Sequence, residues 1–240
     1  NCVVSGNVAV NSPSTLVIDF VTPTDPSCAT FADGQIDMSA SGGTGPYTYS
    51  IDNGVSFQAG TNFFALTAGN YNVVVEDATG CQTNGNTTLT DPAAVIIDNV
   101  IPTDVSCFGD TDGEIAINAS GGVPGYTYSI DGGVNFQGTN IFTGLAPGNY
   151  NIQVNDANSC PAISNGVVGE PLALQIDNIA VTDVTCNGLS DGAITITASQ
   201  GTPAYQYSID GGTSFQASAT FNGLGAGNVT VDVEDNNGCT

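Results

Sequence analysis

The chain has 240 residues and carries 23 Asp and Glu side chains but no Lys, Arg or His, so its formal charge at pH 7 is −23. Nucleic-acid binding needs Lys or Arg to displace counterions from phosphates, and this class of partner is therefore excluded. Without His, Lys or Arg, most acid–base and nucleophilic mechanisms lack their usual residues, so we expect no enzyme.

Apolar residues make up 40% of the sequence, which is enough to build hydrophobic cores, so a folded chain is favoured over disorder. No run of 18 apolar residues occurs, and we expect no membrane insertion in this segment. Because no signal peptide opens the sequence, any signal or anchor is expected to lie outside this segment.

The chain is a tandem array with a period of 79 residues. The motifs YTYSIDNGVSFQ, YTYSIDGGVNFQ and YQYSIDGGTSFQ begin at Tyr47, Tyr126 and Tyr205. A period without gaps predicts one structural unit per repeat. In chain order we expect the C-terminal strand of a preceding repeat and then three repeats, the last truncated before its final strand: residues 1–17, 18–93, 94–172 and 173–240.

Each repeat contains about seven short alternating runs separated by Gly, Asn, Asp and Pro, which is typical of a β-sandwich. The Asp131-Gly132-Gly133 stretch predicts a tight hairpin, because Gly readily adopts the positive φ that such turns need. In the second repeat the expected strands A, B, C, C′, E, F and G are Val95–Val105, Glu114–Ala119, Tyr126–Ile130, Val134–Gln137, Ile141–Leu145, Asn149–Asn155 and Ala162–Val168.

The predicted fold class is all-β, with tandem immunoglobulin-like β-sandwich repeats arranged as a rod. Pairs with proline mark the expected joints at Ser12-Pro13, Asp91-Pro92 and Glu170-Pro171. A joint of a few residues that contains proline favours stiff coupling between neighbouring repeats.

The compound motif of each repeat resembles that of a known family. A cysteine followed by DG and a strand, then YTYSIDGG, FTGLAPGNY and a closing DNNGC, is similar to the SprB-type repeat of large gliding and surface adhesins of Bacteroidota. The resemblance covers essentially the whole chain. It implies an immunoglobulin-like or PKD-like module, an extracellular or cell-surface location, export by type IX secretion and a role in surface attachment, gliding motility or filament formation.

The cysteines fall into two registers, one before strand B and one after strand F: Cys28, Cys107 and Cys186, and Cys2, Cys81, Cys160 and Cys239. Disulfides are expected, because an exported chain meets an oxidising space. The default interpretation pairs cysteines within a repeat, as Cys28–Cys81, Cys107–Cys160 and Cys186–Cys239. Strand order instead puts the two loops at opposite ends of a sandwich, which favours pairs between neighbouring repeats, Cys28–Cys160 and Cys107–Cys239. Both alternatives are open at this point.

Most of the carboxylates recur in register, and two interpretations apply to them. They form turns and keep the surface solvated, or they bind calcium, which prefers six to eight oxygen ligands, at the joints between repeats. The candidate calcium ligands are Asp33, Asp52, Asp91, Asp98, Asp112, Asp131, Asp156, Asp177 and Asp235.

The favoured function is a structural one, a rigid stalk or fibre shaft within a cell-surface adhesin or filament. The alternative is that each repeat is itself an adhesive module that binds a glycan or surface polymer. Near-identity of the repeats favours the shaft, because a spacer needs repetition whereas a specific site needs distinctive residues. The expected partners are neighbouring repeats of the same long chain and other copies in a filament.

Overall fold

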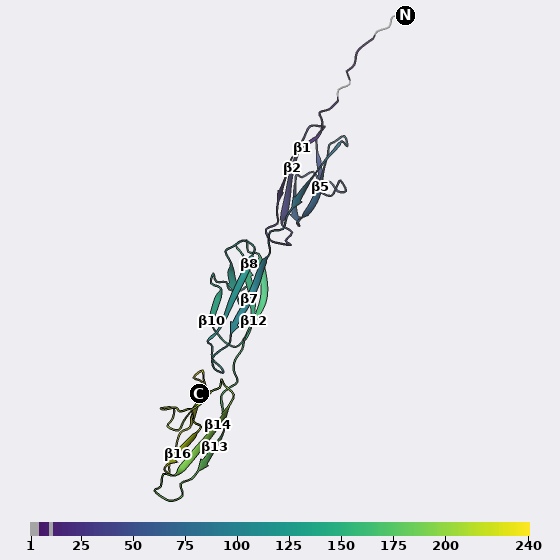
Figure 1. Cartoon of the computed structure of the whole chain (residues 1–240). Coiled ribbons are helices and arrows are strands. Elements are labelled where there is room, and N and C mark those ends of the chain that lie inside the picture. Colours follow the sequence, from purple (N-terminus) through teal and green to yellow (C-terminus); the bar gives the residue numbers. More distant parts are fainter. Residues whose placement is uncertain (1–4, 10–11) are drawn as a thin grey trace. The chain divides into compact units, whose positions relative to one another are not determined.

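The computed structural model describes residues 5–9 and 12–240, which form strands and loops only (Figure 1). Within this part of the chain no helix is long and apolar enough to cross a membrane. The strands are β1 (Val17–Thr24), β2 (Gly34–Ser41), β3 (Thr48–Ser50), β4 (Asn62–Leu66), β5 (Gly69–Glu76), β6 (Gln82–Leu89), β7 (Val95–Thr103), β8 (Gly113–Gly121), β9 (Thr127–Ser129), β10 (Ile141–Leu145), β11 (Gly148–Asn155), β12 (Pro161–Val168), β13 (Gln175–Thr182), β14 (Gly192–Ser199), β15 (Gln206–Ser208), β16 (Thr220–Leu224) and β17 (Asp232–Glu234).

Each of the first two repeats consists of two three-stranded sheets. In the first repeat these are β1-β2-β4 and β3-β5-β6, and the second repeats them as β7-β8-β10 and β9-β11-β12. The pairs are antiparallel, as expected for strands joined by short turns. The third repeat has the sheet β13-β14-β16 but only two strands, β15 and β17, in its second sheet. The predicted all-β fold class is confirmed.

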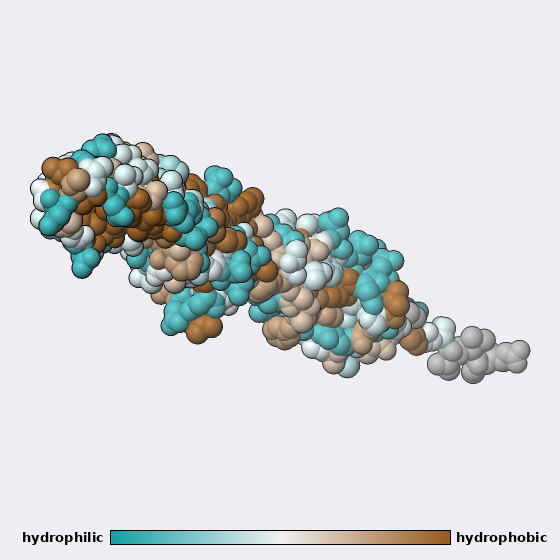
Figure 2. All heavy atoms as spheres, turned by 90° about the horizontal axis from the view of Figure 1, so that it is seen from below, coloured by the Kyte–Doolittle hydropathy of each residue, from teal (hydrophilic) through white to brown (hydrophobic). Residues whose placement is uncertain are grey.

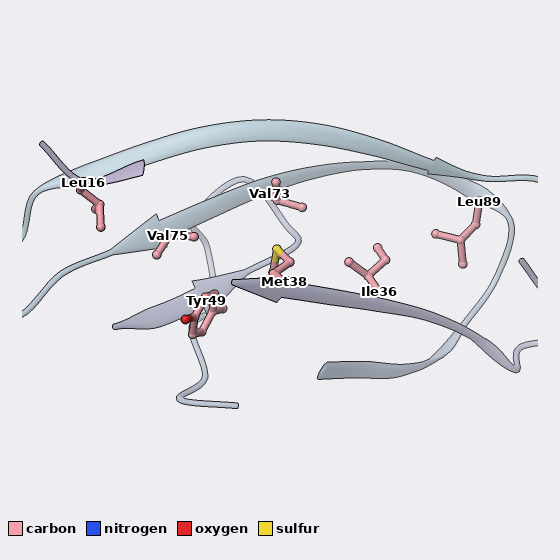
Figure 3. Close-up of a cluster of buried hydrophobic side chains, with 7 residues drawn as sticks. All are labelled: Leu16, Ile36, Met38, Tyr49, Val73, Val75 and Leu89. Atoms are coloured by element: carbon pink, nitrogen blue, oxygen red, sulfur yellow. The ribbon is translucent and has the colours of Figure 1, made fainter. Parts of the chain in front are cut away.

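The core of the first repeat lies between its two sheets. Seven side chains fill it, and Figure 3 shows them between the strands: Leu16, Ile36, Met38, Tyr49, Val73, Val75 and Leu89. Val73 and Val75 are fully buried because alternate residues of β5 face inward. Fully burying one such side chain is worth about 1.5–3 kcal/mol, so these residues determine which face of each strand turns inward.

The strand expected over Val134–Gln137 is wrong. Residues 132–135 form bends, and Gln137 pairs with Tyr128 only in an isolated bridge. The Asp131 carboxylate accepts the backbone N–H groups of Val134 and Asn135, at 3.0 Å each, so these groups are not available to a strand partner. The other six strands of that repeat lie within two residues of their expected bounds.

The chain divides into two compact units that do not follow the repeat boundaries. Unit 1 holds residues up to Ile96 together with 121–125 and 156–160, and unit 2 holds the remainder, Ile97–Ser120, Tyr126–Asn155 and Pro161–Thr240. Two loops of the second repeat therefore group with the first repeat. On the face seen in Figure 2, apolar side chains in brown lie among hydrophilic ones in teal.

Residues 5–9 and 12–16, within the predicted C-terminal strand of a preceding repeat, form no strand. Residues 1–4 and 10–11 lie outside the described part of the chain, and so does Cys2. The assignment of residues 1–17 to a preceding repeat stays a prediction.

Candidate functional site: the disulfide-linked loops

Two disulfides connect loops of successive repeats. In unit 1, Cys28 bonds to Cys160, with 5.4 Å between their Cα atoms, and in unit 2, Cys107 bonds to Cys239, with 5.6 Å. Both pairs are separated by 132 residues in the sequence. Each therefore joins the loop before strand B of one repeat to the loop after strand F of the following repeat. Of the two alternatives left open by the sequence, the structure therefore has the pairing between neighbouring repeats.

The positions of the two loops within a repeat explain this pairing. Cys28 precedes β2 at Gly34, whereas the loop after β5 packs at the other end of β2, where the Ala78 N–H donates to the Thr44 carbonyl at 2.9 Å. An eight-residue strand spans about 26 Å, far beyond the 4.4–6.8 Å that disulfides allow between Cα atoms. Cys81 is exposed and unbonded, as is its counterpart in the other register, Cys186.

A buried aspartate holds the loop that carries Cys160. Asp156 is only 4% exposed, and its carboxylate accepts the N–H groups of Val123, Asn158 and Cys160 at 2.8, 2.9 and 2.9 Å. Burial by itself raises the pKa of Asp156, but the three N–H donors outweigh it, so the pKa lies below its ordinary value. The charged carboxylate thus fixes the backbone of the bonded cysteine.

The same arrangement recurs in the other two repeats. Asp235 accepts the N–H groups of Thr202, Asn237 and Cys239 at 2.7, 2.9 and 3.0 Å. In the first repeat, the Asp77 carboxylate accepts the Thr79 hydroxyl at 2.7 Å and also the Thr44 N–H. These bonds lower the pKa of Asp77 to about 2. Every repeat therefore presents its second cysteine on a loop organised around an ionised aspartate.

A second aspartate organises the loop that carries the partner cysteine. The Asp33 carboxylate accepts both the N–H (2.9 Å) and the hydroxyl (2.5 Å) of Ser27, the residue before Cys28. Asp112 accepts the same two groups of Ser106 in the second repeat. These bonds lower the pKa of both carboxyls, and the bond from the serine hydroxyl is the largest cause. Both cysteines of each disulfide are thus held in preformed loops.

In unit 2 the linker between the second and third repeats is bound at both ends. The N–H of Gly169 donates to Asp104 at 2.7 Å and that of Gly109 to Glu170 at 3.1 Å, which ties the linker to the repeat it leaves. The Leu172 carbonyl accepts the Gly201 N–H at 2.9 Å, which ties the linker to the repeat it enters.

A side-chain contact accompanies the disulfide in unit 2. The Asn237 amide donates to the Ser106 carbonyl at 2.9 Å and to the Thr202 hydroxyl at 3.2 Å. The Sγ of Cys239 lies 3.5 Å from the same carbonyl oxygen. Two covalent connections, the linker and the disulfide, and several hydrogen bonds therefore join successive repeats within this unit.

The structure distributes the nine candidate calcium ligands over several places. Among the described residues, no three acidic or thiol side chains come close enough together to hold a metal ion. Most of these carboxylates have protein donors nearby. Asp98 on β7 accepts the hydroxyl of Ser120, and Asp177 on β13 accepts that of Ser199. Asp91 accepts the Thr30 N–H at 3.2 Å. Calcium binding stays a prediction.

The aspartate of the repeated hairpin is a turn residue. Asp52 accepts the Ser50 hydroxyl and the N–H groups of Val55 and Ser56 at 2.6, 3.1 and 2.9 Å, and the hydroxyl of Ser50 is the largest cause of its lowered pKa. Asp131 makes the equivalent bonds in the second repeat. Tyr49 of the same motif is 5% exposed, so it belongs to the core.

Sequence reasoning missed the donors that serve these aspartates. Ser27, Ser106 and Thr185 recur one residue before each cysteine and bind the aspartate six residues later. Their recurrence in register with the aspartates was the available signal. The bridging amide of Asn237 gave only a partial signal, because Asn158 stands at its place in the second repeat but Thr79 in the first.

The sequence model of the SprB repeat family matches three segments of the chain, residues 21–56, 99–135 and 178–214. The three matches recur with the 79-residue period, and they confirm the resemblance seen in the sequence motifs. No curated protein matches the sequence.

Solved structures with similar folds come from several adhesion and surface proteins. A C-terminal fragment of intimin in complex with the intimin-binding domain of its receptor is 12% identical, with a TM-score of 0.30, over 70% of this chain and 67% of that one. The first three FN domains of chicken CNTN1 are 12% identical, with a TM-score of 0.30, over 94% and 93%. The N-terminal eight immunoglobulin domains of DSCAM are 9% identical, with a TM-score of 0.39, over 88% and 35%. With TM-scores below 0.5, these likenesses carry no functional argument.

Proposed function

We propose that the SprB repeats of this chain form a rigid, non-enzymatic shaft within an extracellular adhesin or filament. The observation that carries the proposal is the covalent link between successive repeats by Cys28–Cys160 and Cys107–Cys239. A flexible tether would not need a second covalent connection at every joint, whereas a shaft that transmits force over many repeats gains from one. An oxidising, extracellular location agrees with these disulfides.

The linker contacts support the same function. In unit 2 the short linker is hydrogen-bonded to the repeat on each side, through Gly169 and Leu172. The uncompensated charge of −23 keeps such a fibre soluble and repels its neighbours. By contrast, the buried tyrosines Tyr49, Tyr128 and Tyr207 are not available as a stacking surface for sugars.

The experiment measures stiffness between the first two repeats. Two dyes are attached through unnatural amino acids at Val55 and Val134, which are 84% and 78% exposed, and single-molecule energy transfer gives the distribution of distances between them. We expect one narrow distribution for the oxidised chain and a broader one after Cys28→Ser. Cys186→Ser, which removes an unbonded thiol, is the matched control and should leave the distribution narrow.

A broad distribution in the oxidised chain would contradict the rigid shaft. Binding of the oxidised chain to a panel of glycans and surface polymers would instead favour the adhesive-module alternative, since a shaft alone has no reason to bind them.

A further inference from the structure

The outer face of one sheet in the second repeat carries no carboxylate, although the chain carries 23. The residues that alternate outward on β11 and β12 form four cross-strand pairs: Asn149↔Val167, Asn151↔Asn165, Gln153↔Ile163 and Asn155↔Pro161. We call these residues the amide face, because five of the eight side chains are amides and the other three are apolar. The carboxylates of this repeat lie on its other strands, its loops and its linker: Asp98, Asp104, Asp110, Asp112, Glu114, Asp131, Asp156 and Glu170.

A hollow of 470 Å³ lies on the amide face, lined by residues 132, 151–153 and 163–165. The Gly132 N–H donates to the Asn151 carbonyl on the side of β11 that faces β9, and β12 lies on the other side. The hairpin and β12 therefore border the hollow, and β11 forms its floor. Ile163 of β12 is 80% exposed and projects beside the hollow.

The other repeats differ at this face. In the first repeat Val74 and Asn84 stand at the places of Gln153 and Ile163. Both other repeats have a glutamate at the place of Asn155, and the third also has Asp232 at the place of Gln153. A carboxylate-free face with a projecting isoleucine thus distinguishes the second repeat.

Asp131 precedes the hollow but directs its charge toward its own loop. Its carboxylate accepts the Ser129 hydroxyl, the N–H groups of Val134 and Asn135, and the Asn135 side-chain amide, the last at 2.7 Å. Four donors thus compensate part of this charge. The polar groups that the amide face offers to a partner are therefore mainly neutral.

The chemistry of the amide face matches a second copy of itself. An amide donates and accepts hydrogen bonds, whereas an ionised carboxylate only accepts them, so two amide faces can pair with each other. Elsewhere on the second repeat, two copies would bring carboxylates together, and in a chain with a charge of −23 such contacts are repulsive. Charge therefore restricts contact between copies to this face.

The hollow and Ile163 are also placed for mutual insertion. Gln153 and Ile163 are directly opposite each other, so the hollow lies beside Ile163 across the strands rather than along them. A two-fold axis parallel to the strands, midway between the two features, puts Ile163 of each copy into the hollow of the other. Such an axis preserves strand direction, so the two copies run in the same direction.

We propose that two copies of this chain associate side by side through the amide faces of their second repeats, with Ile163 of each copy in the hollow of the other. The inference goes beyond the shaft function, and the two can fail separately. Energy transfer within one dilute chain tests stiffness, whereas association between chains tests this contact.

The first test measures the mass of the 240-residue chain by sedimentation and light scattering. Free thiols are alkylated without reduction, so that new disulfides do not contribute. Two eight-residue strands present an area of only about 27 by 10 Å, well below the roughly 800 Å² per partner of stable complexes, so the dimer is weak. A chain that is still monomeric at about 1 mM would overturn the proposal.

Salt dependence tests the neutral character of the contact. As sodium chloride rises from about 0.01 to about 1 M, the screening length falls from about 30 to about 3 Å. Repulsion between the two chains is then screened while amide and apolar contacts persist, so association should strengthen. Association that weakens with salt would contradict a contact between neutral faces.

Two variants of equal charge assign the contact to the hollow. Ile163→Asp should weaken association by about tenfold or more, because a carboxylate would enter the hollow of the other copy. Ile101→Asp, on β7 of the other sheet, adds the same charge and should have little effect. These side chains are 80% and 51% exposed, so both variants should fold. Equal weakening by the two variants would contradict the proposed contact.

Gln153→Glu tests the floor of the hollow with a side chain of the same shape. The carboxylate should weaken association at pH 7, because Ile163 of the other copy would cover it. The ratio of the association constants of the unsubstituted chain and the variant should fall toward one as the pH drops through about 4.3, where glutamate is protonated. A ratio that does not change with pH would refute this role of Gln153.

A photoreactive amino acid at Val167, which is 55% exposed, tests the direction of the two copies. Val167 is paired with Asn149 at one end of β11, and Asn155 lies at the other end. In a mixture of isotope-labelled and unlabelled chains, crosslinks between copies should fall near Asn149. Crosslinks near Asn155 would contradict the two-fold arrangement.

The last measurement tests a different occupant. If the chain stays monomeric and instead binds a neutral polysaccharide through Gln153, the second copy is not the partner. That result would overturn the proposal and favour the adhesive-module alternative.

Discussion

The overlapping disulfides predict how far the chain can be stretched. Force applied at the two termini passes from residue 1 to Cys28, crosses to Cys160, returns along the chain to Cys107 and crosses to Cys239. This route contains about 80 residues, which at about 3.4 Å per residue gives a fully extended length of about 270 Å. A chain without disulfides would reach about 810 Å.

Single cysteine variants separate this pairing from the alternative. Cys28→Ser leaves one disulfide and a route of about 107 residues, so we expect about 360 Å, and the double variant Cys28→Ser, Cys107→Ser should reach about 810 Å. Cys186→Ser should leave the length at about 270 Å, because Cys186 is unbonded.

The assay is single-molecule stretching in optical tweezers, with handles at both termini and force sufficient to unfold every repeat. Pairing within repeats would give the same length for the unsubstituted chain but about 450 Å for Cys186→Ser. That longer extension would refute the reasoning, whereas an unchanged length would support the pairing between repeats.

Four further predictions concern the loops and the carboxylates. Asp156→Ala leaves three N–H groups without an acceptor and should lower the free energy of unfolding in urea by about 3 kcal/mol, while Asp98→Ala, which loses one surface hydroxyl, should cost less than about 1 kcal/mol. Gly122→Ala would place a Cβ 2.6 Å from an Asp156 oxygen at a φ of +57° and should cost about 1–3 kcal/mol in the same assay, whereas Gly138→Ala points into open space and should change stability by less than about 0.5 kcal/mol. The folded pKa of Asp77, about 2, lies below the unfolded value, so its contribution to the stability of the folded state is complete above about pH 4 and is lost as the pH falls through 2. The difference in Tm between the unsubstituted chain and Asp77→Asn should therefore be constant from pH 7 to about 5 and should shrink toward pH 2. If calcium binds the candidate carboxylates, the Tm should be higher in calcium than in EDTA, since a site filled at 100 times its Kd adds about 2.7 kcal/mol; an equal Tm would contradict calcium binding.

The strands were predictable because alternation and turn residues are local properties. β10 was predicted at its observed bounds, Ile141–Leu145, and β11 and β12 within one residue. The expected strand over Val134–Gln137 failed because alternation does not reveal that an aspartate side chain takes the backbone N–H groups the strand would need.

The disulfide pairing could only be narrowed to alternatives. The 79-residue recurrence of the cysteines is compatible with pairs within repeats and with pairs between repeats, and only the order of strands through the sandwich distinguishes the two pairings. The roles of Asp33 and Asp156 in holding the cysteine loops depend on hydrogen-bond donors elsewhere in the sequence. The donor to Asp156 from Val123, for example, lies 33 residues away. Contacts between residues so far apart in the sequence depend on how the backbone folds in three dimensions, and a single sequence does not reveal this.

The overlap of the two disulfide loops has a consequence for survival outside the cell. The loops closed by Cys28–Cys160 and Cys107–Cys239 together cover every peptide bond from residue 28 to residue 239. A protease that cuts once anywhere in this range leaves both fragments attached to each other through at least one disulfide. The chain also offers no Lys or Arg to proteases that require them. Separation into pieces therefore requires a cut near an end, several cuts, or a cut combined with reduction, so a nicked molecule keeps its continuity.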